Sequence, residues 1–283
     1  MSAVAILLIL GAALAHAGWN LFNKQAATAD TMVFLWLVAA GSVTLWAPFA
    51  IATAPPPSLI QLFAMGASSL LHLGYFTLLQ RGYRYGDLSL VYPLARGTGP
   101  MLSSAVAILL LGERPGPVEI AGIMLIGVGI FALGLPSGTA GRPPLPAVGF
   151  GLGTGLFIAA YTILDAESVK HLAVVPVLLL VVQSLGQVLV MTPTVLGRRT
   201  LIGEVWRAHR WRVIGTASLS PLSYIMVLTA LKIAPVSSVA PMREVSVLVG
   251  VILGGRLLAE GQMVRRLTAA GVILGGVIVI AFS

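Results

Sequence analysis

The chain has 283 residues, of which 58% are hydrophobic and only 9% are charged, and its mean hydropathy is +0.99. Soluble domains carry about 25% charged residues, so this composition excludes a water-soluble globular protein and indicates one that lies in lipid. The absence of cysteine excludes disulfides, thiolate metal sites and cysteine nucleophiles. The net charge of +8 is scattered over short connections, which does not predict a nucleic-acid partner.

Ten apolar segments are long enough to cross a bilayer, which takes roughly 20 helical residues. They are Ala3–Phe22, Thr31–Thr53, Leu59–Leu79, Leu88–Leu111, Val118–Leu135, Leu145–Leu164, Leu172–Leu196, Trp211–Leu231, Val236–Leu257 and Leu267–Phe282. The runs are continuous rather than alternating, which argues against a β-barrel. The sequence therefore predicts an all-α membrane protein with ten transmembrane helices. We expect the first segment to be retained, because it lacks the basic start of a signal peptide.

The two halves of the chain resemble each other around one motif. Val91–Arg96 in the first half corresponds to Val239–Glu244 in the second, and a tyrosine, Tyr75 or Tyr224, precedes each motif. An apolar run, a glutamate and a Gly-rich final helix follow in both halves. Aligning them needs one-residue gaps, so the similarity indicates homologous halves rather than a strict period.

Five helices in each half predict an inverted topology. An odd number of spans returns the second half in the opposite orientation, as in many secondary transporters. We therefore predict two inverted five-helix repeats, residues 1–138 and 139–283, around a central cavity, with the linker at Pro136–Pro146. Small-residue motifs predict close helix contacts within the bundle or across a dimer. These motifs are Gly149-x-x-x-Gly153, Gly151-x-x-x-Gly155, Gly250-x-x-x-Gly254 and Gly271-x-x-x-Gly275.

Ionisable side chains inside lipid cost several kcal/mol unless they are paired or hydrated, which makes each one a functional candidate. Arg96 and Arg243 follow a helix proline at near-equivalent repeat positions. We expect both near one cavity, where their planar guanidinium groups would bind a carboxylate or phosphate. The alternative is structural, with an Arg96–Glu244 bridge locking the halves together. Glu244 is the only carboxylate well inside a predicted span, which makes it the candidate proton-coupling site.

Aromatic and amide side chains recur on the same faces of the predicted helices. Those predicted to bind substrate are His16, Trp19 and Asn20 in the first span, His72 and Tyr75 in the third, and Tyr161 and Tyr224 at the matching positions of the second half. Such groups hold an organic solute by stacking and hydrogen bonding. The alternatives are hydrogen bonds between helices and anchoring at the membrane surface.

Three prolines fall inside the predicted fourth and ninth spans. Pro93, Pro100 and Pro241 each remove an intrahelical hydrogen bond and kink or interrupt the helix. The freed carbonyls could line a polar cavity, and the matched positions in the two halves favour this coupling or gating role over a simple packing kink.

Loop charge predicts the orientation of the chain. The connections after the first, third, fifth, seventh and ninth spans, counted with Arg212 and Arg256 at the adjoining span ends, hold 12 Lys and Arg residues, and the other connections hold 3. The positive-inside rule then places both termini outside the cytoplasm.

No P-loop, His-Glu-x-x-His or Gly-x-Ser-x-Gly motif is present, so we expect neither an enzyme nor a cofactor, and the histidines are too dispersed to predict a metal site. Tyr92–Arg96, Leu111–Arg114 and Ala121–Val128 resemble the EamA family of the drug/metabolite transporter superfamily. The resemblance implies a ten-helix basket whose cavity is lined by helices one, three, four, six, eight and nine, with helices five and ten at the rear. It also implies alternating access, frequent export in bacteria, and termini in the cytoplasm. On this last point we follow the charge count.

Together these features predict a secondary transporter of a small zwitterionic or anionic metabolite, such as an amino acid, organic phosphate or phosphonate. We expect a multi-pass protein of the bacterial inner membrane, monomeric or homodimeric, that exports its substrate. The alternatives are an exporter of hydrophobic drugs or cations, which the two arginines disfavour, and a membrane scaffold whose polar residues pair off without a cavity.

Overall fold

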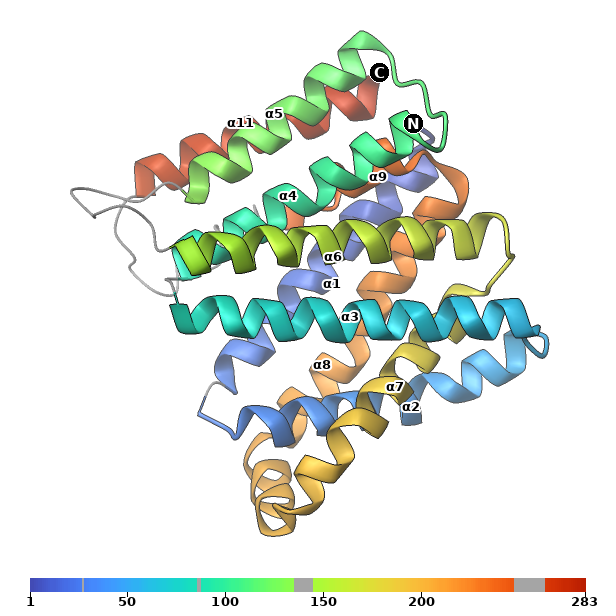
Figure 1. The fold of residues 1–283 in the computed structure, drawn as a ribbon, viewed down its shortest axis with the longest axis vertical. Helices are drawn as coiled ribbons and strands as arrows, with labels where there is room; N and C mark the ends of the chain where they lie inside the picture. The colour runs from blue at the N-terminus through green and yellow to red at the C-terminus, as the bar shows by residue number, and fades with distance from the viewer. Residues whose placement is uncertain (27, 86–87, 135–144, 247–262) are drawn as a thin grey trace.

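The computed structural model describes residues 1–26, 28–85, 88–134, 145–246 and 263–283, and the regular structure of these residues is entirely helical (Figure 1). The helices are α1 (Ala3–Gln25), α2 (Thr31–Thr53), α3 (Leu59–Tyr85), α4 (Leu88–Leu109), α5 (Pro117–Gly134), α6 (Leu145–Lys170), α7 (Pro176–Leu196), α8 (Arg199–Ile233), α9 (Val236–Met242) and α11 (Met263–Phe282). Six of them, α1 to α3 and α6 to α8, are long and apolar enough to cross a membrane. The predicted all-α membrane protein is thereby confirmed.

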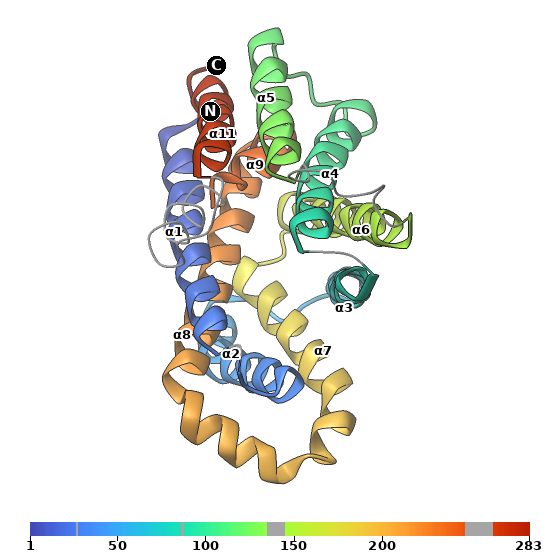
Figure 2. The same ribbon diagram turned by 90° about the vertical axis from the view of Figure 1, so that its left-hand side faces the viewer.

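Helix α8 begins at Arg199 rather than at the predicted Trp211, so most of the connection implied between the predicted spans Leu172–Leu196 and Trp211–Leu231 is helical. Its 35 residues span about 52 Å at 1.5 Å per residue, whereas the hydrocarbon core is about 30 Å thick. Figure 2 shows the first turns of α8 crossing the end of the bundle before the helix enters it. Trp206 and Trp211 are exposed there, as suits a helix at the membrane surface.

Among the other boundaries that differ from the prediction, two bear on the interior of the bundle. Helix α6 continues past Leu164 to Lys170, which places Asp165 inside the helix. Helix α9 ends at Met242, directly after Pro241, in a turn at Arg243–Glu244. The predicted interruption of the ninth span is therefore present, and residues 247–257 of that span lie outside the described residues. Most of the predicted linker also lies outside them.

Polar contacts tie connections together at each end of the bundle. At one end, Arg198 before α8 donates to Asp30, the N-cap of α2, at 2.7 Å. At the other end, Glu113 after α4 accepts hydrogen bonds from the backbone N–H groups of Val236 and Ser237 at 2.7 and 2.8 Å. Glu113 also pairs with Lys170 at 3.6 Å. The glutamate that follows the first repeat motif thus caps α9, a helix of the other half.

The closest helix pairs join the two halves of the chain. Helix α1 packs on α8, α4 and α3 pack on α6, and α5 packs on α11. Figures 1 and 2 show α5 and α11 side by side at one edge of the bundle, where the family resemblance placed the fifth and tenth helices. The halves therefore share one interior, and the cavity described below is formed by both.

Only some of the predicted glycine motifs make close contacts. An added Cβ would lie 2.6 Å from Thr98 Cβ at Gly155, whereas at Gly271 and Gly275 it would meet nothing within 4 Å. Among the described residues, Gly271 and Gly275 therefore make no close contact within the bundle, and the alternative of a contact across a dimer stays a prediction. Their neighbour Gly276 packs instead, with its Cβ position 2.6 Å from the carbonyl oxygen of Gly122 on α5. The motif at Gly250 and Gly254 lies outside the described residues.

Proline-freed carbonyls hold neighbouring helices together. Pro241 cannot donate to the carbonyl of Ser237, and Ser104 on α4 donates to that oxygen at 3.0 Å. Pro221 likewise frees the carbonyl of Ala217, which accepts bonds from Ser42 at 3.3 Å and Trp46 at 3.2 Å, both on α2. At both sites a side chain from another helix takes the freed carbonyl, so these prolines contribute to packing.

Candidate functional site

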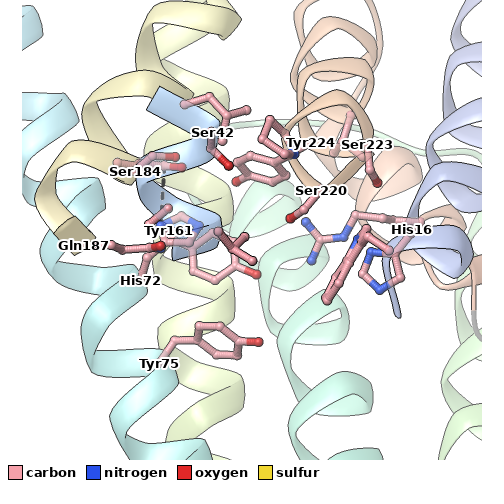
Figure 3. A pocket seen from close by; sticks show the side chains of 18 of the residues that line it. His16, Ser42, His72, Tyr75, Tyr161, Ser184, Gln187, Ser220, Ser223 and Tyr224 are labelled. Atoms are coloured by element: carbon pink, nitrogen blue, oxygen red, sulfur yellow. Dashed lines mark hydrogen bonds between the residues drawn. The ribbon is translucent and has the colours of Figure 1, made fainter. Parts of the chain in front are cut away.

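A cavity of about 200 Å³ lies between the two halves. Helices α1, α2, α3, α4, α6, α7 and α8 line it, together with Arg243 just after α9. Helices α2 and α7 are additions to the set that the resemblance implied. Figure 3 shows His72 and Tyr75 from α3 on one side, facing His16 from α1 and Ser220 from α8 on the other.

An aromatic cluster forms one wall of the cavity. His72 stacks on Tyr161 with ring centroids 3.9 Å apart, and Tyr75 meets the same ring edge-on at 5.9 Å. Tyr224 lies edge-on to His72 at 5.8 Å. Across the cavity, His16 packs against Trp19 at 4.8 Å. These six predicted residues do come together, and they offer flat apolar surfaces with polar atoms at their edges.

The two arginines share one glutamate. Glu244 is fully buried, with Oε2 3.0 Å from Arg96 Nε and Oε1 4.0 Å from Arg243 Nε. The Arg96–Glu244 bridge considered from the sequence is therefore present, and Arg96 also donates to Ser246 at 3.5 Å. Both arginine side chains keep about a tenth of their surface accessible and line the cavity. One negative charge thus faces two positive ones.

Asp165 is a second buried carboxylate, which sequence reasoning missed. Its Oδ2 accepts hydrogen bonds from the Tyr224 hydroxyl at 2.6 Å and from Gln183 Nε2 at 3.3 Å. Gln183 also donates to Ser68 at 2.7 Å, and the Nδ1 of His72 lies 2.9 Å from the Ser68 carbonyl. The prediction that Glu244 is the only carboxylate well inside a span is therefore wrong, because Asp165 is buried within α6. Asp165 was not predicted because the apolar segment ends at Leu164, whereas the helix continues to Lys170.

A signal for Asp165 was available in the spacing. Tyr161 and Asp165 are four residues apart, so they lie on the same face of a helix. Had α6 been extended by one turn, the carboxylate would have been placed behind the predicted aromatic wall.

Of the remaining predicted residues, Asn20, Pro100 and Pro241 are not part of the cavity wall. The Asn20 side chain is exposed and donates to the His16 carbonyl on its own helix at 2.8 Å. Pro100 is buried in α4, and Pro241 ends α9. Helix α4 is continuous from Leu88 to Leu109, so the predicted interruption at Pro93 and Pro100 is wrong. The side chain of Pro93 lies outside the described residues.

Comparison with known proteins gives a family match for the first half of the chain and a fold for nearly all of it. Residues 3–135 match the sequence profile of the EamA-like transporter family. A crystal structure titled only as that of a protein superposes with a TM-score of 0.78 over 98% of each chain, at 15% identity. At that identity the likeness shows the fold alone. No curated protein matches the chain.

Proposed function

We propose that this chain, whose residues 3–135 match the EamA-like transporter family, is a transporter of that kind and carries a small anionic or zwitterionic metabolite across the membrane through the cavity. The substrate class is an amino acid, an organic phosphate or a phosphonate. The two halves would rock about the cavity as two inverted five-helix repeats, exposing it to each side in turn. A bacterial inner membrane remains the expected location.

The observation that carries the proposal is the position of Arg243. Its guanidinium lies on the cavity wall, and among the described residues Glu244 alone is within ion-pair distance, at 4.0 Å. Arg96 holds the same glutamate at 3.0 Å. The positive charge of Arg243 is therefore only partly balanced, which suits a carboxylate or phosphate oxygen as the missing partner.

The size and walls of the cavity support a small substrate. Drug-sized ligands occupy sites of about 300–1,000 Å³, whereas this cavity holds about 200 Å³. The stacked rings of His72 and Tyr161 offer a face for a small organic group. A hydrophobic cation would meet two arginines, which argues against a drug exporter. A scaffold whose polar residues pair off completely would have no such cavity.

The test is ligand-induced stabilisation of the purified protein. A ligand that binds only the folded state raises the melting temperature, by an amount that grows with its concentration relative to the Kd. The panel contains glutamate, glycine, methanesulfonate, inorganic phosphate, methylphosphonate and two cationic drugs. We expect shifts with anions or zwitterions that Arg243→Ala abolishes.

The matched control is Arg207→Ala, which removes an arginine from the exposed first turns of α8. This variant should keep every shift of the wild type. Shifts with the cationic drugs alone, or anion shifts that survive Arg243→Ala, would contradict the proposal and assign the arginines to structure.

A further inference from the structure

The Asp165 carboxyl group is deeply buried and only half satisfied. None of its surface is accessible. Oδ2 accepts two hydrogen bonds, whereas Oδ1 has no hydrogen-bond partner among the described residues. A buried carboxylate with an unpaired oxygen is costly in free energy, and a proton on that oxygen removes the charge.

No arginine or lysine of the described part of the chain lies within 4 Å of Asp165. The two cavity arginines contact Glu244 instead. The Nδ1 of His72 lies 2.9 Å from a backbone carbonyl, so that nitrogen must carry a hydrogen, and a neutral ring then keeps its lone pair on Nε2. Asp165 is thus the one carboxyl of the cavity region without a cationic partner at contact distance in the described residues.

Tyr224 connects this carboxyl to the cavity. Its ring is part of the cavity wall, and its hydroxyl donates to Asp165 Oδ2 at 2.6 Å. Gln183 and His72 also separate Asp165 from the cavity, and both line it. A change of charge on Asp165 therefore changes the electrostatic potential at the place where the substrate would bind.

Charge balance gives this arrangement a function. With Arg96, Arg243, Glu244 and Asp165 all ionised, the four charges cancel, and a bound anion leaves the site with a net negative charge. With a proton on Asp165 the site carries one positive charge, which an anion neutralises. An uncompensated charge in a membrane interior is costly, so the proton and the anion each favour the binding of the other.

We propose that Asp165 is a proton-binding site coupled to the substrate, so that the anion and a proton are carried together. This inference rests on the proposed function, and it moves the coupling role from Glu244 to Asp165. Because the proton and the anion cross in the same direction, an inward proton gradient would drive uptake of the anion. This direction contrasts with the export that the resemblance implies. The proton leaves Asp165 as the anion leaves the site, so charge is conserved over the cycle.

Several groups face Asp165 and set the pH range of the coupling. They are His72 from α3, Tyr161 on α6 itself, Gln183 from α7 and Tyr224 from α8, with Arg96 on α4 and Arg243 and Glu244 after α9 across the cavity. Of these, His72 is the other side chain that can gain a proton, on its Nε2 atom. The variant His72→Gln therefore separates its contribution from that of Asp165.

The first experiment needs no ligand. The infrared band of a protonated carboxylic acid is recorded between pH 5 and pH 9 for the wild type, Asp165→Asn and Glu244→Gln. We expect the wild type to show a band that grows as the pH falls, that Asp165→Asn abolishes and that Glu244→Gln retains. A band absent from the wild type, or one that persists in Asp165→Asn, overturns the proposal.

The second experiment counts protons. Calorimetric binding of methanesulfonate, whose charge is constant over this range, is measured in two buffers with different ionisation enthalpies. The wild type should take up nearly one proton per anion on the alkaline side, and its affinity should rise up to tenfold per unit fall in pH. In Asp165→Asn and not in His72→Gln, proton uptake should vanish and affinity should become independent of pH.

Two further outcomes remain decisive. If no anion of the panel binds, the proposed function fails, and the infrared band still decides whether Asp165 holds a proton. If Asp165→Asn does not fold, Tyr224→Phe removes only the hydroxyl donor and should shift the carboxylic acid band. A band unmoved by Tyr224→Phe would contradict the assignment to Asp165.

Discussion

The contact between α5 and α11 gives a sharp test of the packing, through substitution of two neighbouring glycines. An added Cβ at Gly276 would lie 2.6 Å from the carbonyl oxygen of Gly122 and 3.0 Å from the backbone nitrogen of Ile126. At Gly275 it would meet no atom of the described residues within 4 Å. Both variants therefore add one methyl group. In Gly276→Ala the methyl group meets backbone atoms of α5, whereas in Gly275→Ala it meets none of the described residues.

The expected magnitude follows from these distances. Ordinary contact begins near 3.4 Å, so Gly276→Ala must move two helices apart by about 0.8 Å. The atoms that it meets are backbone, and they cannot rotate away as the end of a side chain can. Overpacking of this kind costs about 1–3 kcal/mol. The higher helix propensity of alanine offsets up to about 1 kcal/mol of that cost, and at Gly275 it acts alone.

The assay is thermal unfolding of the purified protein in detergent, followed by the fraction that remains monodisperse after heating. Gly276→Ala should lower the midpoint, and Gly275→Ala should leave it unchanged or raise it slightly. Equal losses from both variants would refute the reasoning, because they would mean that the face carrying Gly275 is also covered in the folded protein.

Two further predictions concern the ends of the bundle. Glu113→Gln should lower the free energy of unfolding by about 1–3 kcal/mol in a denaturant titration, because a neutral amide weakens two charge-assisted bonds to the start of α9, whereas Glu204→Gln on the exposed surface should not. At the other end, the Val33 backbone N–H, with help from Arg198, holds the pKa of Asp30 below its ordinary value. This stabilisation is therefore present at neutral pH and is lost as the pH falls through the lowered pKa. Asp30→Asn should lower the free energy of unfolding by up to about 1 kcal/mol at pH 7. The difference in unfolding free energy between the variant and the wild type should shrink below about pH 4. A difference that is the same at every pH would contradict the role of the carboxylate.

Hydropathy alone was enough to locate the six helices that are long and apolar enough to cross a membrane, because the requirement that a lipid-embedded backbone satisfies its own hydrogen bonds is local. It failed where a helix continues into polar residues. Helix α6 carries Asp165 beyond its apolar stretch, and α8 begins with a polar segment outside the membrane core. In both places the chain stays helical because water or a buried partner satisfies the side chains.

The sequence by itself determined the membrane environment and the helical class, because composition and hydropathy are enough for both. It offered the pairing of Arg96 with Glu244 as one of two interpretations, and the structure decided that the bridge is present. The tertiary structure alone decided which glycines touch and that Asp165 lies beside Tyr224, 59 residues away. The reason is the rotation of each helix about its own axis. In lipid, apolar side chains face both the solvent and the interior, so hydropathy does not reveal which face of a helix turns inward.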